Sequence, residues 1–209
     1  MEGDLGWEWL GRLDYLDALD RQRRRRDAIL AGTAAEVVWL LEHDPVITTG
    51  RRGGLQSGVD TLPVVETERG GLATYHGPGQ LVGYLLVDVG RRGSGVRRTV
   101  EAVERGIVTW LEGRGVAAGP RAGYPGVWVG RDKICAVGMH FRRGVSMHGF
   151  ALNLTVDLAG FSGFVPCGVT DGGVTSLALV SGAEVPPQAA AGSVAAAVLE
   201  ALSRSWAGG

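Results

Sequence analysis

Lysine is almost absent from this chain of 209 residues: the sequence has 21 basic residues, and Lys133 is its single lysine. A guanidinium stays charged at every biological pH, whereas an amine that is buried or placed near other charges can become neutral and accept a proton. Lys133 lies in a run of β-branched and aromatic residues, 126–138, that predicts a strand. The one amine is therefore a candidate for proton transfer, and drift in an arginine-rich composition is the alternative.

Cysteine and long hydrophobic runs are also scarce. The two cysteines, Cys135 and Cys167, allow at most one disulfide, and a cytosolic setting would keep both thiols reduced. No stretch approaches 18 consecutive apolar residues, and the first residues are acidic where a signal peptide is basic, so a cytoplasmic location is expected. The net charge of −1 provides no general attraction to nucleic acid.

The sequence has no recognisable nucleotide or metal motif. Nothing matches the phosphate-loop pattern G-x-x-x-x-G-K-[ST], because the only lysine is followed by isoleucine, and ATP is therefore not indicated. The possible zinc ligands show neither C-x-x-C nor H-x-x-x-H spacing; they are Cys135, His140, His148 and Cys167. We expect no cofactor and no metal.

Glycine is abundant instead. The chain has 35 glycines, more than double the background of about 7%, so many loops need positive φ or a close backbone approach. The segment 69–80 places four glycines and a proline around His76. Its backbone N–H groups could bind an anion or a developing oxyanion. A glycine-rich turn is the alternative, but it does not explain the arginine, histidine and glutamine of this segment.

Hydrophobic periodicity predicts an α+β fold in a single domain, residues 1–209. Strands are expected at 7–12, 36–42, 64–65, 81–89, 127–129, 133–141 and 146–154, with the last two joined as a hairpin through 142–144. Helices are expected at 14–30, 96–113 and 187–206, with a short helix beginning near 174–176. No repeat or long linker divides the chain.

The two cysteines have different surroundings. Cys167 stands between Pro166 and Gly168 in a predicted loop, where a structural cysteine is uncommon, so it is a candidate nucleophile that a nearby ammonium from Lys133 would activate. Cys135 competes for this role because residues i and i+2 share a strand face, which would aim it the same way as Lys133. Its apolar neighbours nevertheless indicate a structural residue.

The first predicted helix contains a basic run, formed by Arg21, Arg23, Arg24, Arg25 and Arg26. We interpret this run first as a solvated helix face. A docking patch for an acidic protein is the second interpretation, and nucleic acid is a distant third.

Four motifs occur in order along the chain: Arg69-Gly-Gly-x-x-Thr-Tyr-His-Gly-Pro-Gly-Gln80, Lys133-Ile-Cys-Ala-Val-Gly138, His148-Gly-Phe-Ala-Leu-Asn153, and Pro166-Cys-Gly168 followed by Thr175-Ser176. Together they closely resemble the lipoyl(octanoyl) transferases of the lipoate pathway, and the resemblance covers nearly the whole chain. Two positions depart from the family pattern, Asp44 in place of a second proline and Thr155 in place of an acidic residue. Neither touches the expected chemistry.

The resemblance implies the fold of the biotin and lipoate protein ligases, a mixed β-sheet flanked by helices with a smaller second sheet. It implies transfer of an octanoyl group from octanoyl-acyl carrier protein to the lysine of lipoyl domains, as the first step of protein lipoylation. The acceptors would be the 2-oxoacid dehydrogenase complexes and the glycine cleavage system H protein. It implies no nucleic-acid or membrane partner, and a monomer is slightly favoured.

The resemblance also implies roles for individual residues. Cys167 would be the nucleophile that forms an acyl thioester, with Lys133 as its partner. The implied substrate contacts are Arg69, Gly70, Gly71, Leu72, Ala73, Thr74, Tyr75, His76, Ala136, Val137, Gly138, Gly149, Phe150 and Ala151. The chemistry is consistent with these roles, since exchange between thioesters is nearly balanced in energy and needs no nucleotide.

Two other functions remain open at this point. One is an ATP-dependent lipoate or biotin protein ligase of the same fold, which would have no use for the thiol of Cys167. The other is a noncatalytic protein that binds acyl groups or lipoyl domains.

Overall fold

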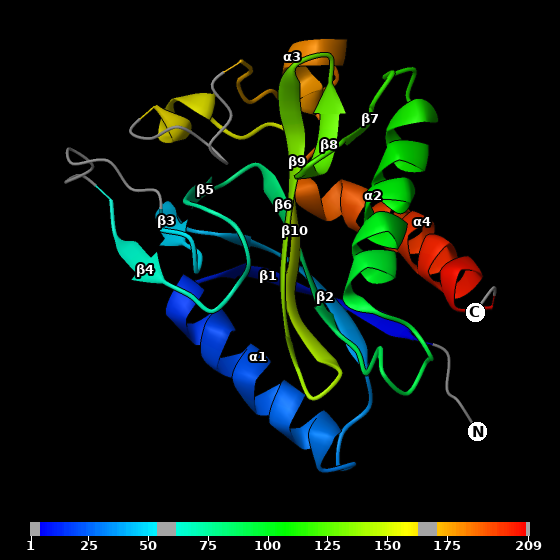
Figure 1. The fold of residues 1–209 in the computed structure, drawn as a ribbon. Helices are drawn as coiled ribbons and strands as arrows, with labels where there is room; N and C mark the ends of the chain where they lie inside the picture. Colours follow the sequence, from blue (N-terminus) through cyan, green and yellow to red (C-terminus); the bar gives the residue numbers. More distant parts are fainter. Residues whose placement is uncertain (1–4, 54–61, 163–170, 208–209) are drawn as a thin grey trace.

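The computed structural model describes residues 5–53, 62–162 and 171–207 (Figure 1). Its elements are, in chain order, β1 (Gly6–Leu13), α1 (Tyr15–Leu30), β2 (Val37–His43), β3 (Val46–Thr49), β4 (Val64–Glu66), β5 (Thr74–His76), β6 (Gln80–Leu86), α2 (Val96–Glu112), β7 (Gly119–Arg121), β8 (Tyr124–Val129), β9 (Asp132–Arg142), β10 (Val145–Asn153), the 3-10 helix η1 (Leu158–Phe161), α3 (Leu177–Ser181) and α4 (Pro187–Ala207). None of the helices in these ranges is long and apolar enough to cross a membrane.

The strands form two sheets. The larger sheet has seven strands in the order β1-β2-β6-β10-β9-β8-β7, and the smaller has the order β4-β3-β5. The larger sheet is mixed, because β1 and β2 run parallel whereas its other neighbouring strands are antiparallel. The expected α+β fold with a smaller second sheet is confirmed.

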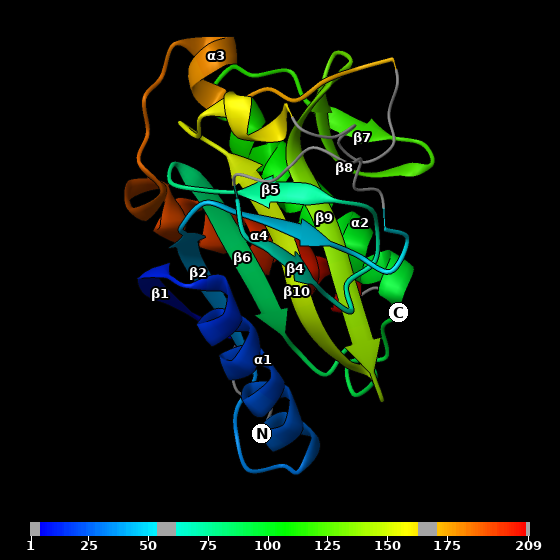
Figure 2. The same ribbon diagram turned by 90° about the vertical axis from the view of Figure 1, so that its left-hand side faces the viewer.

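The helices cover both faces of the larger sheet (Figure 2). On one face α2 and α4 pack over a core that includes Leu85, Ile107 and Val198. On the other face α1 packs over a second core that includes Leu19 and Leu86, and the smaller sheet lies beside it. α2 has this position because its apolar residues recur at helical spacing and form one buried stripe.

The hairpin of β9 and β10 brings two sequence motifs together. Its turn has positive φ at Arg143 and Gly144, 49° and 88°. The resulting register places Gly149 opposite Gly138 and Ala151 opposite Ala136. These small residues from two separate motifs therefore lie side by side on the sheet.

Most predicted elements are present, with ends shifted by a few residues. Asp14 is the N-cap of α1 rather than its first residue, and its side chain accepts hydrogen bonds from the backbone N–H groups of Leu16 and Asp17. The short elements β3, β5, β7 and η1 were not predicted. β5 has three residues within the glycine-rich segment, so too few alternating positions were available to indicate a strand.

Candidate functional site

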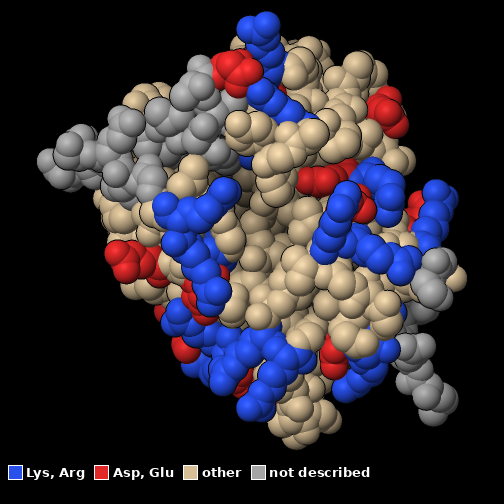
Figure 3. All heavy atoms as spheres, viewed as in Figure 1, with Lys and Arg blue, Asp and Glu red and all other residues tan. Residues whose placement is uncertain are grey.

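A cavity of about 270 Å³ opens beside the β9–β10 hairpin. Its walls come from α1, the loop before β5, the first turns of α2, the start of β8, and the hairpin itself. Figure 3 shows a hollow in this face that is lined largely by uncharged residues, with arginine side chains on both sides of it. The cavity can therefore hold an apolar group close to surfaces of positive charge.

Most of the residues expected at the site line this one cavity: Lys133, Arg69, Gly70, Gly71, Leu72, Thr74, His76, Ala136, Val137, Gly138, Gly149, Phe150 and Ala151. Ala73 and Tyr75 belong instead to the small core beside β3, where Tyr75 packs against the ring of Phe161. Strand alternation explains the difference, because Thr74 and His76 take the opposite face of β5. Cys167 lies outside the described residues.

Lys133 is buried in the cavity wall, with 5% of its surface exposed. Its Nζ donates a hydrogen bond of 2.9 Å to the carbonyl oxygen of Pro125 and lies 4.7 Å from the ring centroid of Trp128. Both contacts favour a cationic amine, because a carbonyl oxygen and an aromatic face are partially negative. The chain's only lysine is therefore held by specific contacts rather than extended into solvent.

The chain that follows Cys167 is attached directly to Lys133. The Lys133 N–H donates to the carbonyl oxygen of Gly173 at 2.9 Å, and the N–H of Thr175 donates to the carbonyl oxygen of Lys133 at 3.0 Å. Asp132 adds a hydrogen bond from the N–H of Gly173 to its carboxylate at 2.7 Å. Five residues lie between Cys167 and Gly173, and the six steps from one to the other span at most about 20 Å in an extended chain.

Arg121 makes a second attachment to the same segment. Its guanidinium forms an ion pair with Asp171 at 2.7 Å and lies 5.0 Å from the ring centroids of both Tyr124 and Trp128. Because Trp128 also faces Lys133, the aromatic ring lies against both the arginine and the lysine, of which only the lysine lines the cavity. Residues 171–175 are thus anchored beside the amine at several points.

Cys135 lies in the core rather than in the cavity wall. It is fully buried beside Ile134 in the core under α2, and burial raises the pKa of its thiol. The expectation that it shares a strand face with Lys133 is wrong. The pairing of β8 with β9 shifts register at this point, so Ile134 and Cys135 both pack in the core whereas Lys133 and Ala136 both line the cavity.

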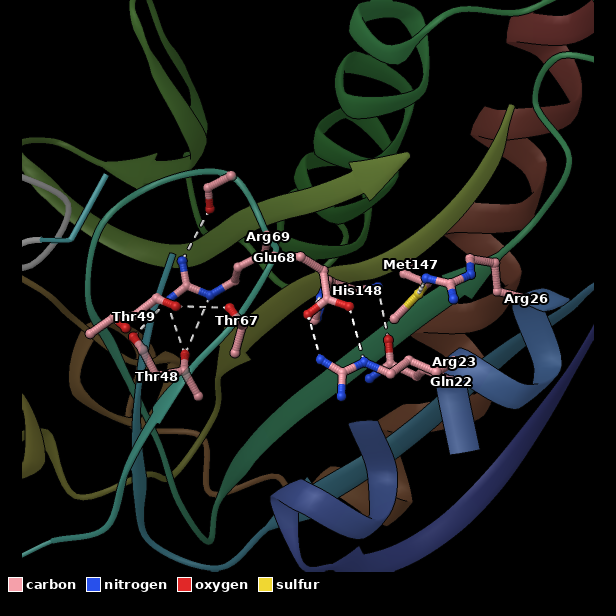
Figure 4. A network of polar contacts seen from close by, with 11 residues as sticks. Gln22, Arg23, Arg26, Thr48, Thr49, Thr67, Glu68, Arg69, Met147 and His148 are labelled. Carbon is pink, nitrogen blue, oxygen red and sulfur yellow. Dashed lines mark hydrogen bonds and ion pairs between the residues drawn. The ribbon is translucent and has the colours of Figure 1, made fainter. Parts of the chain in front are cut away.

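Arg69 uses its guanidinium to shape the glycine-rich loop. It donates to the carbonyl oxygens of Thr48 at 2.6 Å and Leu72 at 2.7 Å, and to the hydroxyl of Thr48 at 2.9 Å (Figure 4). The backbone is close-packed here, because a Cβ added to Gly50 would lie 2.5 Å from the carbonyl oxygen of Gly71. The loop along the cavity is therefore rigidly braced to β3.

Two buried histidines, His76 and His148, line the cavity, and the ring centroid of His43 lies 5.8 Å from that of His76. Burial lowers the pKa of His43 to about 4, and of both His76 and His148 to about 3. His76 Nδ1 is 2.7 Å from Gln80 Oε1, and His43 Nε2 is 2.6 Å from the hydroxyl of Tyr84. These rings are neutral near pH 7, and they act as hydrogen-bonding and packing groups rather than as cations.

Most of the arginine run is used within the protein. Arg23 forms two hydrogen bonds with the carboxylate of Glu68, the residue before Arg69 (Figure 4). Although burial opposes ionisation of Glu68, the hydrogen bonds from Arg23 lower its pKa to about 2. Arg26 has only 6% of its surface exposed and donates to the sulfur of Met147. The interpretation of the run as a solvated helix face is therefore wrong for Arg26.

Sequence reasoning missed one acidic residue next to the site, Glu104. Its Oε1 accepts a hydrogen bond of 2.7 Å from the N–H of Gly126, and burial raises the pKa of the carboxyl. The sequence contains a signal for this residue, because Glu104 is an acidic residue between Val100 and Ile107 in the apolar stripe of α2. A carboxylate in that stripe needs a buried partner.

Among the described residues, no group of three or more histidine, cysteine or acidic side chains is arranged to hold a metal ion.

The chain is similar to several known proteins. A model of the lipoyl protein ligase A/B catalytic domain matches residues 14–202. An octanoyltransferase of Novosphingobium aromaticivorans is 47% identical over 182 residues, which are 84% of this chain and 82% of that protein. An octanoyltransferase of Geobacter metallireducens is 43% identical over 178 residues, 85% of this chain and 84% of that protein.

Two solved structures show the same fold at low sequence identity. A putative lipoate protein ligase from Thermoplasma acidophilum with bound lipoic acid has a TM-score of 0.66 at 14% identity, covering 97% of this chain and 86% of that one. A biotin protein ligase from Aquifex aeolicus has a TM-score of 0.58 at 10% identity, covering 98% and 72%. The expectation of a fold like that of the biotin and lipoate protein ligases is confirmed.

Proposed function

This chain belongs to the lipoyl protein ligase A/B catalytic-domain family, and we propose that it is an acyltransferase that moves an octanoyl group onto a lysine of another protein. The donor is octanoyl-acyl carrier protein, and the acceptors are lipoyl domains of 2-oxoacid dehydrogenase complexes and the glycine cleavage system H protein. This reaction is the first step of protein lipoylation. One observation carries the proposal: the only lysine of the chain lines the cavity and is hydrogen-bonded to the segment that follows Cys167.

In the first half of the reaction, the thiolate of Cys167 attacks the thioester carbonyl of the donor. The tetrahedral intermediate collapses, the bond to the carrier's sulfur breaks, and that sulfur takes a proton from the ammonium of Lys133. The products are an octanoyl thioester on Cys167, a free carrier thiol and a neutral amine on Lys133. The backbone N–H of Cys167 or of Gly77 would stabilise the oxyanion, since Pro78 has no N–H and the N–H of Gly79 donates to Glu42.

In the second half, the amine of the acceptor lysine attacks the thioester on Cys167. An amide bond forms, the thioester bond breaks, and the neutral amine of Lys133 takes the proton that the attacking nitrogen releases. Cys167 leaves as a thiolate and Lys133 is again an ammonium, so the site returns to its starting state. No nucleotide is consumed, because the acyl group arrives already activated as a thioester.

The cavity supplies the binding energy for the acyl chain. Its wall includes Val82, Val100, Met139 and Phe150, and apolar contacts of this kind stabilise a bound chain by about 0.8 kcal/mol per buried CH₂. An eight-carbon chain therefore gains several kcal/mol. Ala136 and Ala151, which are paired across the hairpin and both line the cavity, have short side chains that leave room for it.

A mass measurement tests the proposal directly. The protein is incubated with octanoyl-acyl carrier protein in the absence of ATP, and the expected result is one octanoyl group added through a thioester at Cys167. Cys167→Ser prevents this thioester, whereas Cys135→Ala leaves it unchanged because Cys135 lies in the core. An unmodified Cys167, or acylation that requires ATP, would contradict the proposal and support a ligase instead.

A noncatalytic binding protein is tested with the same reagents. The proposal predicts that octanoyl groups appear on a lipoyl domain only when carrier, enzyme and acceptor are combined. A protein that only binds would form complexes without transfer.

A further inference from the structure

One peptide group connects Lys133 to Glu104. The carbonyl oxygen of Pro125 accepts a hydrogen bond from Lys133 Nζ at 2.9 Å, and the N–H of Gly126 donates to Glu104 Oε1 at 2.7 Å. These two atoms belong to the same planar peptide unit, so its orientation is set from both ends. Glu104 and Lys133 are both buried, with 8% and 5% of their surfaces exposed.

Packing leaves this peptide little freedom. Gly126 has a φ of +129°, and a Cβ at this position would lie 2.4 Å from the carbonyl oxygen of Cys135 and 3.2 Å from Lys133 Cε. The backbone therefore approaches the lysine side chain as closely as a residue without a side chain allows. The buried N–H of Gly126 needs an acceptor, and α2 supplies it through Glu104.

The carboxylate of Glu104 also places a negative charge at the N–H side of the peptide whose carbonyl oxygen binds the amine of Lys133. A carboxylate that accepts from the N–H of a peptide polarises that peptide and makes its carbonyl oxygen a stronger acceptor. Burial raises the pKa of the Glu104 carboxyl, and the hydrogen bond from Gly126 and the charge of Lys133 oppose that effect.

We propose that Glu104 is a positioning residue that acts through the Pro125–Gly126 peptide and holds the amine of Lys133 at the cavity wall. The placement of Lys133 by Glu104 does not depend on the proposed acyl-transfer function. Only its expected effect on activity rests on that function. In that reaction, the fixed ammonium is the group that protonates the departing carrier thiol.

The single lysine makes a direct measurement possible. Protein labelled with lysine carrying ¹³C at Cε gives one lysine resonance, and its chemical shift and linewidth report the surroundings and mobility of Lys133 alone. Among the described residues, the other charged or titratable groups near this pair are Cys135 on β9, Arg121 on β7 and Glu101 on α2. Each is unchanged in both Glu104 variants, so any difference comes from the substituted position.

Three variants separate the contributions. Glu104→Gln keeps an acceptor for Gly126 but removes the charge, and Glu104→Ala removes both. Glu112→Gln is the matched control, since it removes an exposed carboxylate at the end of the same helix. Both Glu104 variants should shift and sharpen the lysine resonance, because the amine is held less firmly, whereas Glu112→Gln stays near the wild type. An unchanged resonance in both Glu104 variants would overturn the proposal.

Transfer assays then distinguish this inference from the proposed function. Glu104→Ala should lower kcat by about tenfold with little change in KM, with Glu104→Gln between it and the wild type. If Lys133→Ala is inactive but both Glu104 variants keep the wild-type kcat, the positioning role is overturned and the function stands. If Lys133→Ala remains active, the proposed function is overturned, and the lysine resonance alone decides the role of Glu104. Glu104→Gln preserves the shape of the side chain, so the test survives if Glu104→Ala fails to fold.

Discussion

Lys133 and Gly173 share a backbone hydrogen bond of 2.9 Å, which joins the strand carrying the only lysine to the segment that begins just after Cys167. The two positions are far apart in sequence, and the bond makes them neighbours. Because a strand pairing fixes backbone positions more firmly than a side-chain contact does, any change that displaces residues 171–175 is expected to disturb the site as a whole.

Replacement of Lys133 by arginine should be nearly as damaging as replacement by alanine. A guanidinium is a permanent cation, so it can neither release a proton to the carrier thiol nor accept one from the acceptor amine. Both variants are expected to lower kcat by about 100-fold or more. The control is Arg131→Lys, an exposed position two residues away that should keep wild-type rates. Substantial activity in Lys133→Arg would show that only the charge is needed.

Gly172→Ala should lower transfer activity strongly. A Cβ at this position would lie 2.0 Å from the carbonyl oxygen of Arg131, so the segment must move away from β9. A displacement of about 1 Å at a reacting group can cost roughly 100-fold in rate. Gly119→Ala on β7 is the control, because a Cβ there meets nothing within 4 Å. Equal kcat values for the two variants would contradict the prediction.

The protein should lose stability as the pH falls below 6.5. Burial holds the folded pKa of His43 near 4 and those of His76 and His148 near 3, below the ordinary value of 6.5. The unfolded chain therefore binds more protons in this range, and the stabilisation present above pH 6.5 is lost as the pH falls toward 4 and 3. Each ring should contribute on the order of 1 kcal/mol of destabilisation by pH 5.

Urea unfolding at pH 7 and pH 5 measures this loss. The midpoint should be clearly lower at pH 5, and an unchanged midpoint would show that the rings accept protons in the folded state without penalty.

Two arginines of the basic run should differ sharply in their effect on stability. Arg26 is buried against Met147 and paired with Asp27, so Arg26→Ala removes packing and leaves polar groups unpaired, with an expected cost of about 1 to 3 kcal/mol. Arg24 pairs with Asp20 on the surface, and Arg24→Ala should change the free energy of unfolding by less than about 0.5 kcal/mol. Urea titrations measure the free energy of unfolding of both variants. Equal losses of stability in the two variants would contradict the prediction.

Docking of the acidic carrier can be tested at the same exposed position. If Arg24 contacts the carrier, Arg24→Glu should raise the KM for octanoyl-acyl carrier protein and leave kcat unchanged, because a rim charge acts mainly on encounter. An unchanged KM would mean that the carrier docks elsewhere.

The main elements of the fold could be predicted from local sequence patterns. The alternation in 133–141 and 146–154 and the helical stripe of α2 each depend on residues close together in the chain. Short elements such as β3 and β5 could not be predicted in this way. Three or four residues carry too little periodicity, and their pairing partners lie far along the sequence. The wrong prediction about Cys135 has the same cause, because a register shift at Ile134 depends on the partner strand.

The sequence by itself determined which groups are available for chemistry: one amine, two thiols and a glycine-rich loop around His76. It also determined the family, because its four motifs keep their order and spacing. Only the tertiary structure decided which of these groups meet. It placed Lys133 in a cavity wall and Cys135 in the core, paired Arg23 with Glu68, buried Arg26, and bonded Glu104 to the peptide that holds the lysine. The physical reason is that burial, register and pairing partners are properties of residues distant in sequence, and folding alone brings them together.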